Sequence, residues 1–172
     1  MNGRRRRWLL PLLSIAVGGG ETLLIIELVL AVLPVSDTLQ ALPVNAQNPV
    51  LRFRPNRDVT ISRGYDFALR ADKHVNNYGF VNDTDYDPDA DQPLLAIIGD
   101  SYVEATQVTN REAMHGRLPE LLDAQARVYS FGASGAPLST YLAYAEYARN
   151  TFAPEAMVFV IVGNDFDESW LH

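Results

Sequence analysis

The sequence contains no cysteine, which excludes disulfides, a thiolate nucleophile and cysteine-ligated metal sites. Histidine is scarce, since His74, His115 and His172 are the three in the chain. Basic residues are also few outside the N-terminus. When Arg4–Arg7 and two early glutamates are set aside, 10 basic residues face 19 acidic ones. A body this acidic argues against nucleic acid as a partner, because phosphate binding needs a basic face.

Long apolar runs are concentrated near the N-terminus. Residues 8–35 form an apolar segment longer than the roughly 20 residues that cross a bilayer. Four arginines precede it and predict a cytoplasmic basic tail at residues 1–7, because positive charge stays inside. We therefore expect a single-pass signal anchor with a periplasmic or otherwise extracytoplasmic body. A cleaved signal peptide is the alternative, but no clean cleavage site closely follows residues 9–20.

Residues 36–92 are rich in proline, asparagine and aspartate and show little sustained periodicity. Two stretches favour extended structure, residues 59–62 as a short strand and residues 75–80 as a strand end with a turn. We expect this segment to be an ordered extracytoplasmic arm or linker that leads into a domain at residues 93–172.

From residue 93 onward, short apolar runs alternate with helical patterns. Strands are predicted at residues 94–98, 127–131 and 157–162. Thr109 and Glu112 have the spacing of a capping box before one helix, and a second helix is predicted over residues 139–152. The apolar faces expected for the two helices comprise Met114, Leu118, Leu121 and Leu122 in the first, and Leu142, Ala145 and Phe152 in the second. The repeat of about 30 residues is that of βαβ units and predicts a parallel α/β sheet.

Three turns with polar or glycine residues follow these three strands. They are Gly99-Asp100-Ser101, Gly132-Ala133-Ser134-Gly135 and Gly163-Asn164-Asp165. Right-handed crossovers bring such turns to one edge of the sheet. A serine hydroxyl, a glycine N–H and an asparagine amide would meet there, which is the set that acyl transfer needs. The alternative for Ser101 is a helix cap, and Asp100 is expected to brace the serine loop.

These motifs resemble the SGNH, or GDSL-like, hydrolases of the membrane-anchored bacterial type. Gly99-Asp100-Ser101 matches the first block of that family, Ser130–Gly135 resembles the second and Gly163-Asn164-Asp165 matches the third. The resemblance implies a flavodoxin-like parallel sheet, with three of five strands in this chain, and reaction at ester-linked acyl groups without a cofactor. The catalytic residue would be Ser101, with an oxyanion hole formed by Ser101, Gly135 and Asn164. Gly99, Asp100 and Asp165 would support the site.

The last block of that family, Asp-x-x-His, is not found in this chain. We expect His74, His115 and His172 to be surface histidines, with His115 on the outer face of its helix. Without a base, Ser101 is a poor nucleophile, so the chain is expected to be nearly inactive and to be the N-terminal part of a longer enzyme. A sheet of three strands would also leave residues 158–162 exposed.

Three functions remain open at this point. The first is a serine esterase or lipase-like hydrolase with a small-molecule or glycan ester as substrate. The second is an O-acyltransferase acting on envelope polysaccharide, and the third is a non-catalytic binding module. No metal site is expected, because no histidine pair accompanies Asp165 and Asp167 and hydrogen bonding in a turn explains them.

Overall fold

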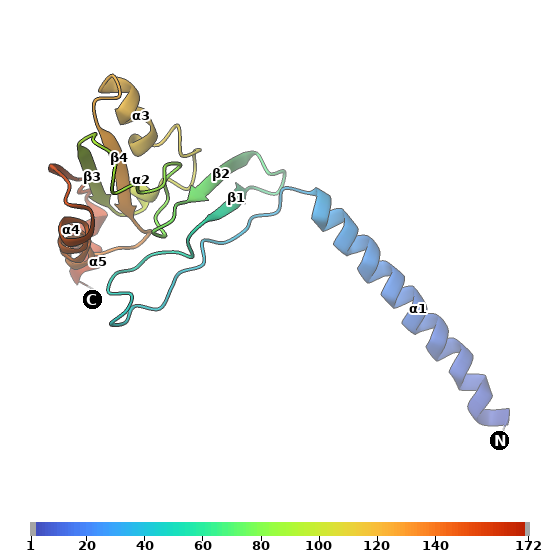
Figure 1. Ribbon diagram of the computed structural model, residues 1–172. Coiled ribbons are helices and arrows are strands. Elements are labelled where there is room, and N and C mark those ends of the chain that lie inside the picture. Colours follow the sequence, from blue (N-terminus) through green and yellow to red (C-terminus); the bar gives the residue numbers. More distant parts are fainter. Residues whose placement is uncertain (1–2, 171–172) are drawn as a thin grey trace. The chain divides into compact units, whose positions relative to one another are not determined.

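A computed structural model describes residues 3–170, with side chains described from Trp8 onward. The chain divides into two units, Met1–Val35 and Ser36–His172. The first unit is built on helix α1 (Gly3–Val32; Figure 1). Its stretch Trp8–Val32 has a mean hydropathy of 2.0 and none of its most apolar window is buried. The helix is therefore long and apolar enough to cross a membrane.

The second unit begins with a β-hairpin formed by β1 (Arg57–Arg63) and β2 (Leu69–Val75). The strands are antiparallel and in register from Arg57 opposite Val75 to Arg63 opposite Leu69. The predicted strand at residues 59–62 lies inside β1, and the predicted strand end at residue 75 is the end of β2. Both predictions are confirmed.

A parallel sheet of three strands forms the centre of this unit. Its strands are β3 (Leu94–Gly99), β4 (Arg127–Gly132) and β5 (Ala156–Phe159), in the order β4-β3-β5. All three predicted strands are confirmed, although β5 ends at Phe159 rather than at residue 162. The helices are α2 (Ser101–Glu104), α3 (Met114–Leu121), α4 (Leu138–Phe152) and α5 (Asn164–Trp170). The predicted mixed α/β class with a parallel sheet is therefore confirmed.

Helices cover both faces of the sheet (Figure 1). Because successive side chains of a strand point to opposite faces, β3 and β4 each contribute to a cluster on each side. Leu94, Ala96 and Ile98 belong to a core cluster that includes the buried face of α4. Ile97 packs in a second cluster with Val103 of α2, against which Leu118 of α3 is also placed. The central strand β3 is thus buried on both faces, as its uninterrupted apolar run predicts.

The buried faces of the two longer helices differ from the predicted ones. In α4 the buried residues are Tyr141, Tyr144, Ala148 and Phe152, whereas Leu142 is 70% exposed. The prediction of a buried Leu142 is wrong because the tyrosines, one position earlier, occupy the core-facing side. In α3 the buried residue is His115, and Leu121 is 77% exposed. Leu121 as a core residue and His115 as a surface residue are therefore both wrong predictions.

The capping box is found only in part. The Thr109 N–H and hydroxyl both donate to Glu112 Oε2, which is the predicted backward contact. The two residues close a turn ahead of α3, because that helix begins at Met114 and its N-cap is Ala113. The predicted pair is thus present, but it does not cap the helix.

Residues 36–92 contribute to the same core as the parallel sheet. Val50 and Phe80 are buried in the cluster of α4, and the Phe80 ring contacts the Phe131 ring edge-on at 4.7 Å between centroids. Asn82 covers the free edge of β4, because its amide accepts from the Ser130 N–H and donates to the Ser130 carbonyl oxygen. The outer edge of β4 is therefore paired through a side chain.

The opposite edge of the sheet is open to solvent among the described residues. Val158 and Phe159 of β5 are 40% and 43% exposed, and Ile161 after the strand is 53% exposed. The predicted exposure of the third strand is confirmed at these three residues.

Candidate active site

Ser101 is the second residue after the central strand, which ends at Gly99, and is the first residue of α2. The helix is capped by Asp100, whose carboxylate accepts from the Tyr102 N–H at 3.0 Å. The alternative that Ser101 caps the helix is therefore wrong, because the preceding residue fills that role. Asp100 thus holds the start of α2 through a hydrogen bond, and the Ser101 side chain is half-buried at the carboxyl edge of the sheet.

Two glycines allow α2 to pack closely on the strand ends. A Cβ at Gly99 would lie 2.5 Å from Val103 Cγ2, and one at Gly132 would lie 2.9 Å from Val103 Cβ. Neither distance is compatible with a side chain at the glycine, so the short helix that begins with Ser101 needs both residues. This close approach explains the glycine at the end of each of the first two strands.

The first and third turns meet at Asp100. The Ser101 hydroxyl donates to Asp100 Oδ2 at 3.3 Å, and the Asn164 amide donates to the same oxygen at 3.4 Å. Asn164 is exposed and begins α5, while Asp100 is fully buried beneath it. The structure therefore brings together the serine and asparagine that the sequence places 63 residues apart.

The second turn is joined to α2 by Glu104. The Ser134 N–H donates to Glu104 Oε2 at 2.7 Å, and the Ser134 hydroxyl donates to the same oxygen. Burial raises the pKa of Glu104, although these two hydrogen bonds act in the opposite direction. Gly135 follows with a φ of +76°, and nothing lies within 4 Å of the position of its Cβ. The space beside this predicted oxyanion-hole residue is thus open.

A buried lysine from the hairpin accompanies Glu104. Lys73 of β2 is 1% exposed, and its Nζ has no hydrogen-bond partner among the described residues. Burial lowers the pKa of Lys73 to about 8, while the charges of Asp83, Glu104 and Glu112 raise it. Sequence reasoning missed Lys73 and Glu104, since each is a single charged residue whose burial depends on partners far along the chain.

None of the histidine contacts within residues 8–170 involves Ser101. His115 is 4% exposed and lines a cleft of about 360 Å³ with Asn82 and Arg127. Because Arg127 begins β4, this cleft lies at the amino end of the strands, away from Ser101. His74 is half-buried, with Nδ1 2.7 Å from Asp58 Oδ1. The predicted surface residue His172 lies outside the described residues.

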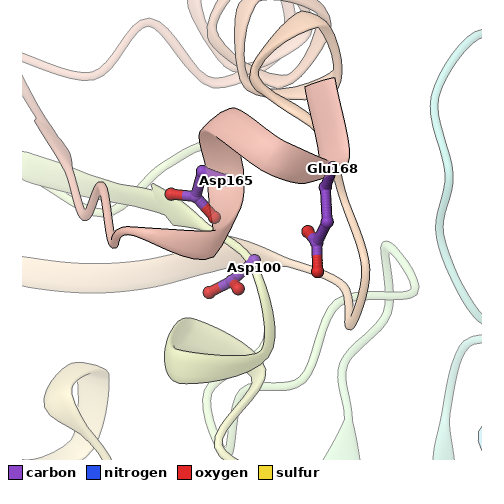
Figure 2. Close-up of side chains that lie close together, drawn as sticks. All are labelled: Asp100, Asp165 and Glu168. Atoms are coloured by element: carbon purple, nitrogen blue, oxygen red, sulfur yellow. The ribbon is translucent and has the colours of Figure 1, made fainter. Parts of the chain in front are cut away.

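Asp165 belongs to a cluster of three carboxylates that sequence reasoning did not predict. Asp100, Asp165 and Glu168 each place one oxygen within 4.8 Å of the others (Figure 2). Asp165 is fully buried and accepts from the Val162 N–H through Oδ2 at 2.8 Å. The predicted supporting residues Asp100, in the serine loop, and Asp165, in α5, thus lie close together.

Comparison of the sequence with models of known protein families and with curated proteins gives no match.

Proposed function

We propose that the chain is a membrane-anchored serine hydrolase of the SGNH, or GDSL-like, type. Its substrate would be an ester-linked acyl group of a small molecule or glycan at the cell envelope. One observation carries the proposal: the Ser101 hydroxyl and the Asn164 amide share Asp100 Oδ2 at the carboxyl edge of the sheet. In open α/β sheets, ligands bind outside this edge.

The arrangement supports the acyl-transfer chemistry in three ways. Ser101 follows the central strand, where its oxygen can attack a carbonyl carbon from the solvent side. Asn164 can donate a hydrogen bond to the oxyanion without bringing charge, and Gly135 is exposed with open space around the position of its Cβ. The strand order β4-β3-β5 corresponds to the first three strands of a flavodoxin-like sheet, which supports that fold for the domain.

The proposed reaction needs a base that takes the proton of the Ser101 hydroxyl. Among the described residues, the Ser101 hydroxyl donates its hydrogen bond to Asp100 Oδ2, at 3.3 Å. A carboxylate that also caps a helix is a weaker general base at neutral pH than an imidazole. We therefore expect slow reaction at Ser101, faster when imidazole is added to the solution. In a binding module of the same fold, Ser101 would not react either with or without imidazole.

A serine-reactive fluorophosphonate tests the proposal on the full chain in a non-ionic detergent. Peptide mass analysis should find the label on Ser101, and imidazole should raise the labelling rate. Ser101→Ala should abolish labelling. Ser139→Ala should leave it unchanged, because Ser139 is an exposed serine in the first turn of α4 and thus matches Ser101 in local structure. A folded protein that stays unlabelled at Ser101, even with imidazole, would refute the hydrolase proposal and favour a binding module.

The anchor is part of the same proposal. We infer that α1 crosses the membrane with its arginine-rich end in the cytoplasm, because Arg4–Arg7 precede the apolar stretch. Protease added to the extracytoplasmic side should then degrade the body from residue 36 onward and spare an N-terminal tag. Protection of the body in spheroplasts, in which the membrane that α1 would cross is intact and its outer side is accessible to protease, would contradict this topology.

A further inference from the structure

We propose that Asp100, Asp165 and Glu168 bind a Ca²⁺ ion that ties the serine loop to α5. The three carboxylates come from two places in the chain, the end of β3 and the short helix α5 (Figure 2). One oxygen of each lies within 4.8 Å of the others. Asp100 also accepts from Ser101 and Asn164, so this ion would lie beside the proposed hydrolase site, but ion binding does not require that chemistry.

Two oxygens of the cluster are buried without a hydrogen-bond donor among the described residues. They are Asp165 Oδ1 and Glu168 Oε2. Asp165 is fully buried, so Oδ1 has no access to bulk water. Buried polar atoms in native proteins nearly always have a partner, and a buried carboxylate needs a compensating charge. Both atoms therefore point to a missing ligand.

The groups around the cluster do not supply that charge. The Asn164 amide donates to Asp100 and to Glu168 Oε1, at 3.4 and 3.2 Å, but it is neutral. Among the side chains of residues 8–170, none of the ion pairs includes one of the three acids. Three carboxylates this close repel one another unless a cation or a proton lies between them.

Tyr141 gives an independent indication from another helix. It lies on α4, is 2% exposed and has a hydroxyl without a hydrogen-bond partner among the described residues. The hydroxyl lies next to Asp165: burial raises the pKa of Tyr141, and after burial its side-chain interaction with Asp165 and the charges of Asp100, Asp165 and Glu168 raise it further. Although it is close to Asp165, it does not meet that carboxylate in hydrogen-bond geometry. With Asp165 Oδ1 and Glu168 Oε2, it is a third buried oxygen at the cluster without a hydrogen-bond partner among the described residues.

The chemistry of these groups favours Ca²⁺. All of them are oxygens, which hard cations prefer, so the absence of a histidine pair does not argue against this ion. Ca²⁺–oxygen distances of about 2.3–2.6 Å separate opposite ligands by about 4.6–5.2 Å. Oxygens no more than 4.8 Å apart are close enough to share one such ion. Water and backbone carbonyls can complete the six to eight ligands that Ca²⁺ takes.

Terbium luminescence tests the site on the full chain in non-ionic detergent after treatment with EDTA. Tb³⁺ substitutes for Ca²⁺ and should be sensitised by excitation of Tyr141 at about 280 nm. We expect saturable emission at one ion per chain, displaced by Ca²⁺. Glu168→Gln should weaken Tb³⁺ binding at least tenfold, and Asp167→Asn should leave it unchanged, because Asp167 is exposed on the same helix.

Thermal unfolding gives a second readout that needs no luminescence. Ca²⁺ should raise the melting temperature of the wild type and of Asp167→Asn, but not that of Glu168→Gln, because an ion stabilises only the fold that binds it. Far-ultraviolet circular dichroism without metal shows whether each variant is folded. A folded wild type without Ca²⁺-displaceable Tb³⁺ binding would overturn the proposal. An equal loss in Asp167→Asn and Glu168→Gln would overturn it as well, because binding would then be to the acidic surface.

Discussion

The buried imidazole of His115 should make the second unit sensitive to mild acid. Its side chain is 4% exposed, and neither ring nitrogen has a hydrogen-bond partner among the described residues. Burial, and after it the positive charge of Lys73, lowers the pKa of His115 from 6.5 to about 4. The folded protein therefore keeps this imidazole neutral at a pH where the unfolded chain protonates it.

The magnitude follows from proton linkage. The contribution of His115 is complete above pH 6.5 and is lost as the pH falls toward the folded-state pKa of about 4. Relative to pH 7, the free energy of unfolding should fall by about 2 kcal/mol at pH 5 and by about 3 kcal/mol at pH 4 from this residue alone. Carboxylates elsewhere in the chain titrate in the same range. The quantity to measure is therefore the difference in unfolding free energy between the wild type and His115→Leu.

Urea unfolding followed by near-ultraviolet circular dichroism, from pH 7.5 to pH 4, measures this difference. His115→Leu should lose less stability than the wild type across that interval, by about 2–3 kcal/mol. At pH 7.5 the two should differ by about 1 kcal/mol or less, because the imidazole nitrogens make no hydrogen bonds that leucine would remove. Equal acid sensitivity of wild type and His115→Leu would refute the reasoning.

Two further predictions concern buried hydrogen bonds and are measured by urea unfolding at pH 7.5. Asn82→Ala should lower the free energy of unfolding by about 2–4 kcal/mol, because it leaves the backbone N–H and carbonyl of Ser130 unpaired. Ser130→Ala keeps both of these backbone hydrogen bonds to Asn82 and should lower it less. Tyr144→Phe should cost about 1–2 kcal/mol, because the hydroxyl donates to the Leu51 carbonyl at 2.7 Å. Tyr141→Phe, without such a bond, should cost less, and equal losses in the two tyrosine variants would contradict this account.

The strands could be predicted because their signal is local. Residues 94–98, 127–131 and 157–162 are apolar runs that end at glycine or turn residues, and a strand buried on both faces needs nothing more. The parallel pairing followed from the spacing of about 30 residues. The strands depend on neighbours within one segment, and their pairing depends on the spacing between segments.

The helix faces could not be predicted in the same way. Leucine was expected to be buried in preference to tyrosine, which is reasonable when the hydroxyl has no partner. Tyr144 is fully buried because its hydroxyl meets the Leu51 carbonyl, 93 residues away in the sequence. The burial of α4 thus depends on a residue in a segment that showed no periodicity. The same applies to His115, whose burial follows from the packing of α3 on the sheet.

The candidate site has features that could be predicted from the sequence and features that depend on distant residues. Topology predicted that the turns of Ser101 and Asn164 meet, since crossover handedness fixes which edge the strand ends share. What holds them together was unpredictable, because Asp100 accepts from both and Glu104 anchors Ser134 only once the elements have packed. Buried carboxylates cost free energy unless donors or ions surround them. A sequence reports their number but not their desolvation, so the acids at this edge remain indistinguishable from surface acids until the fold is known.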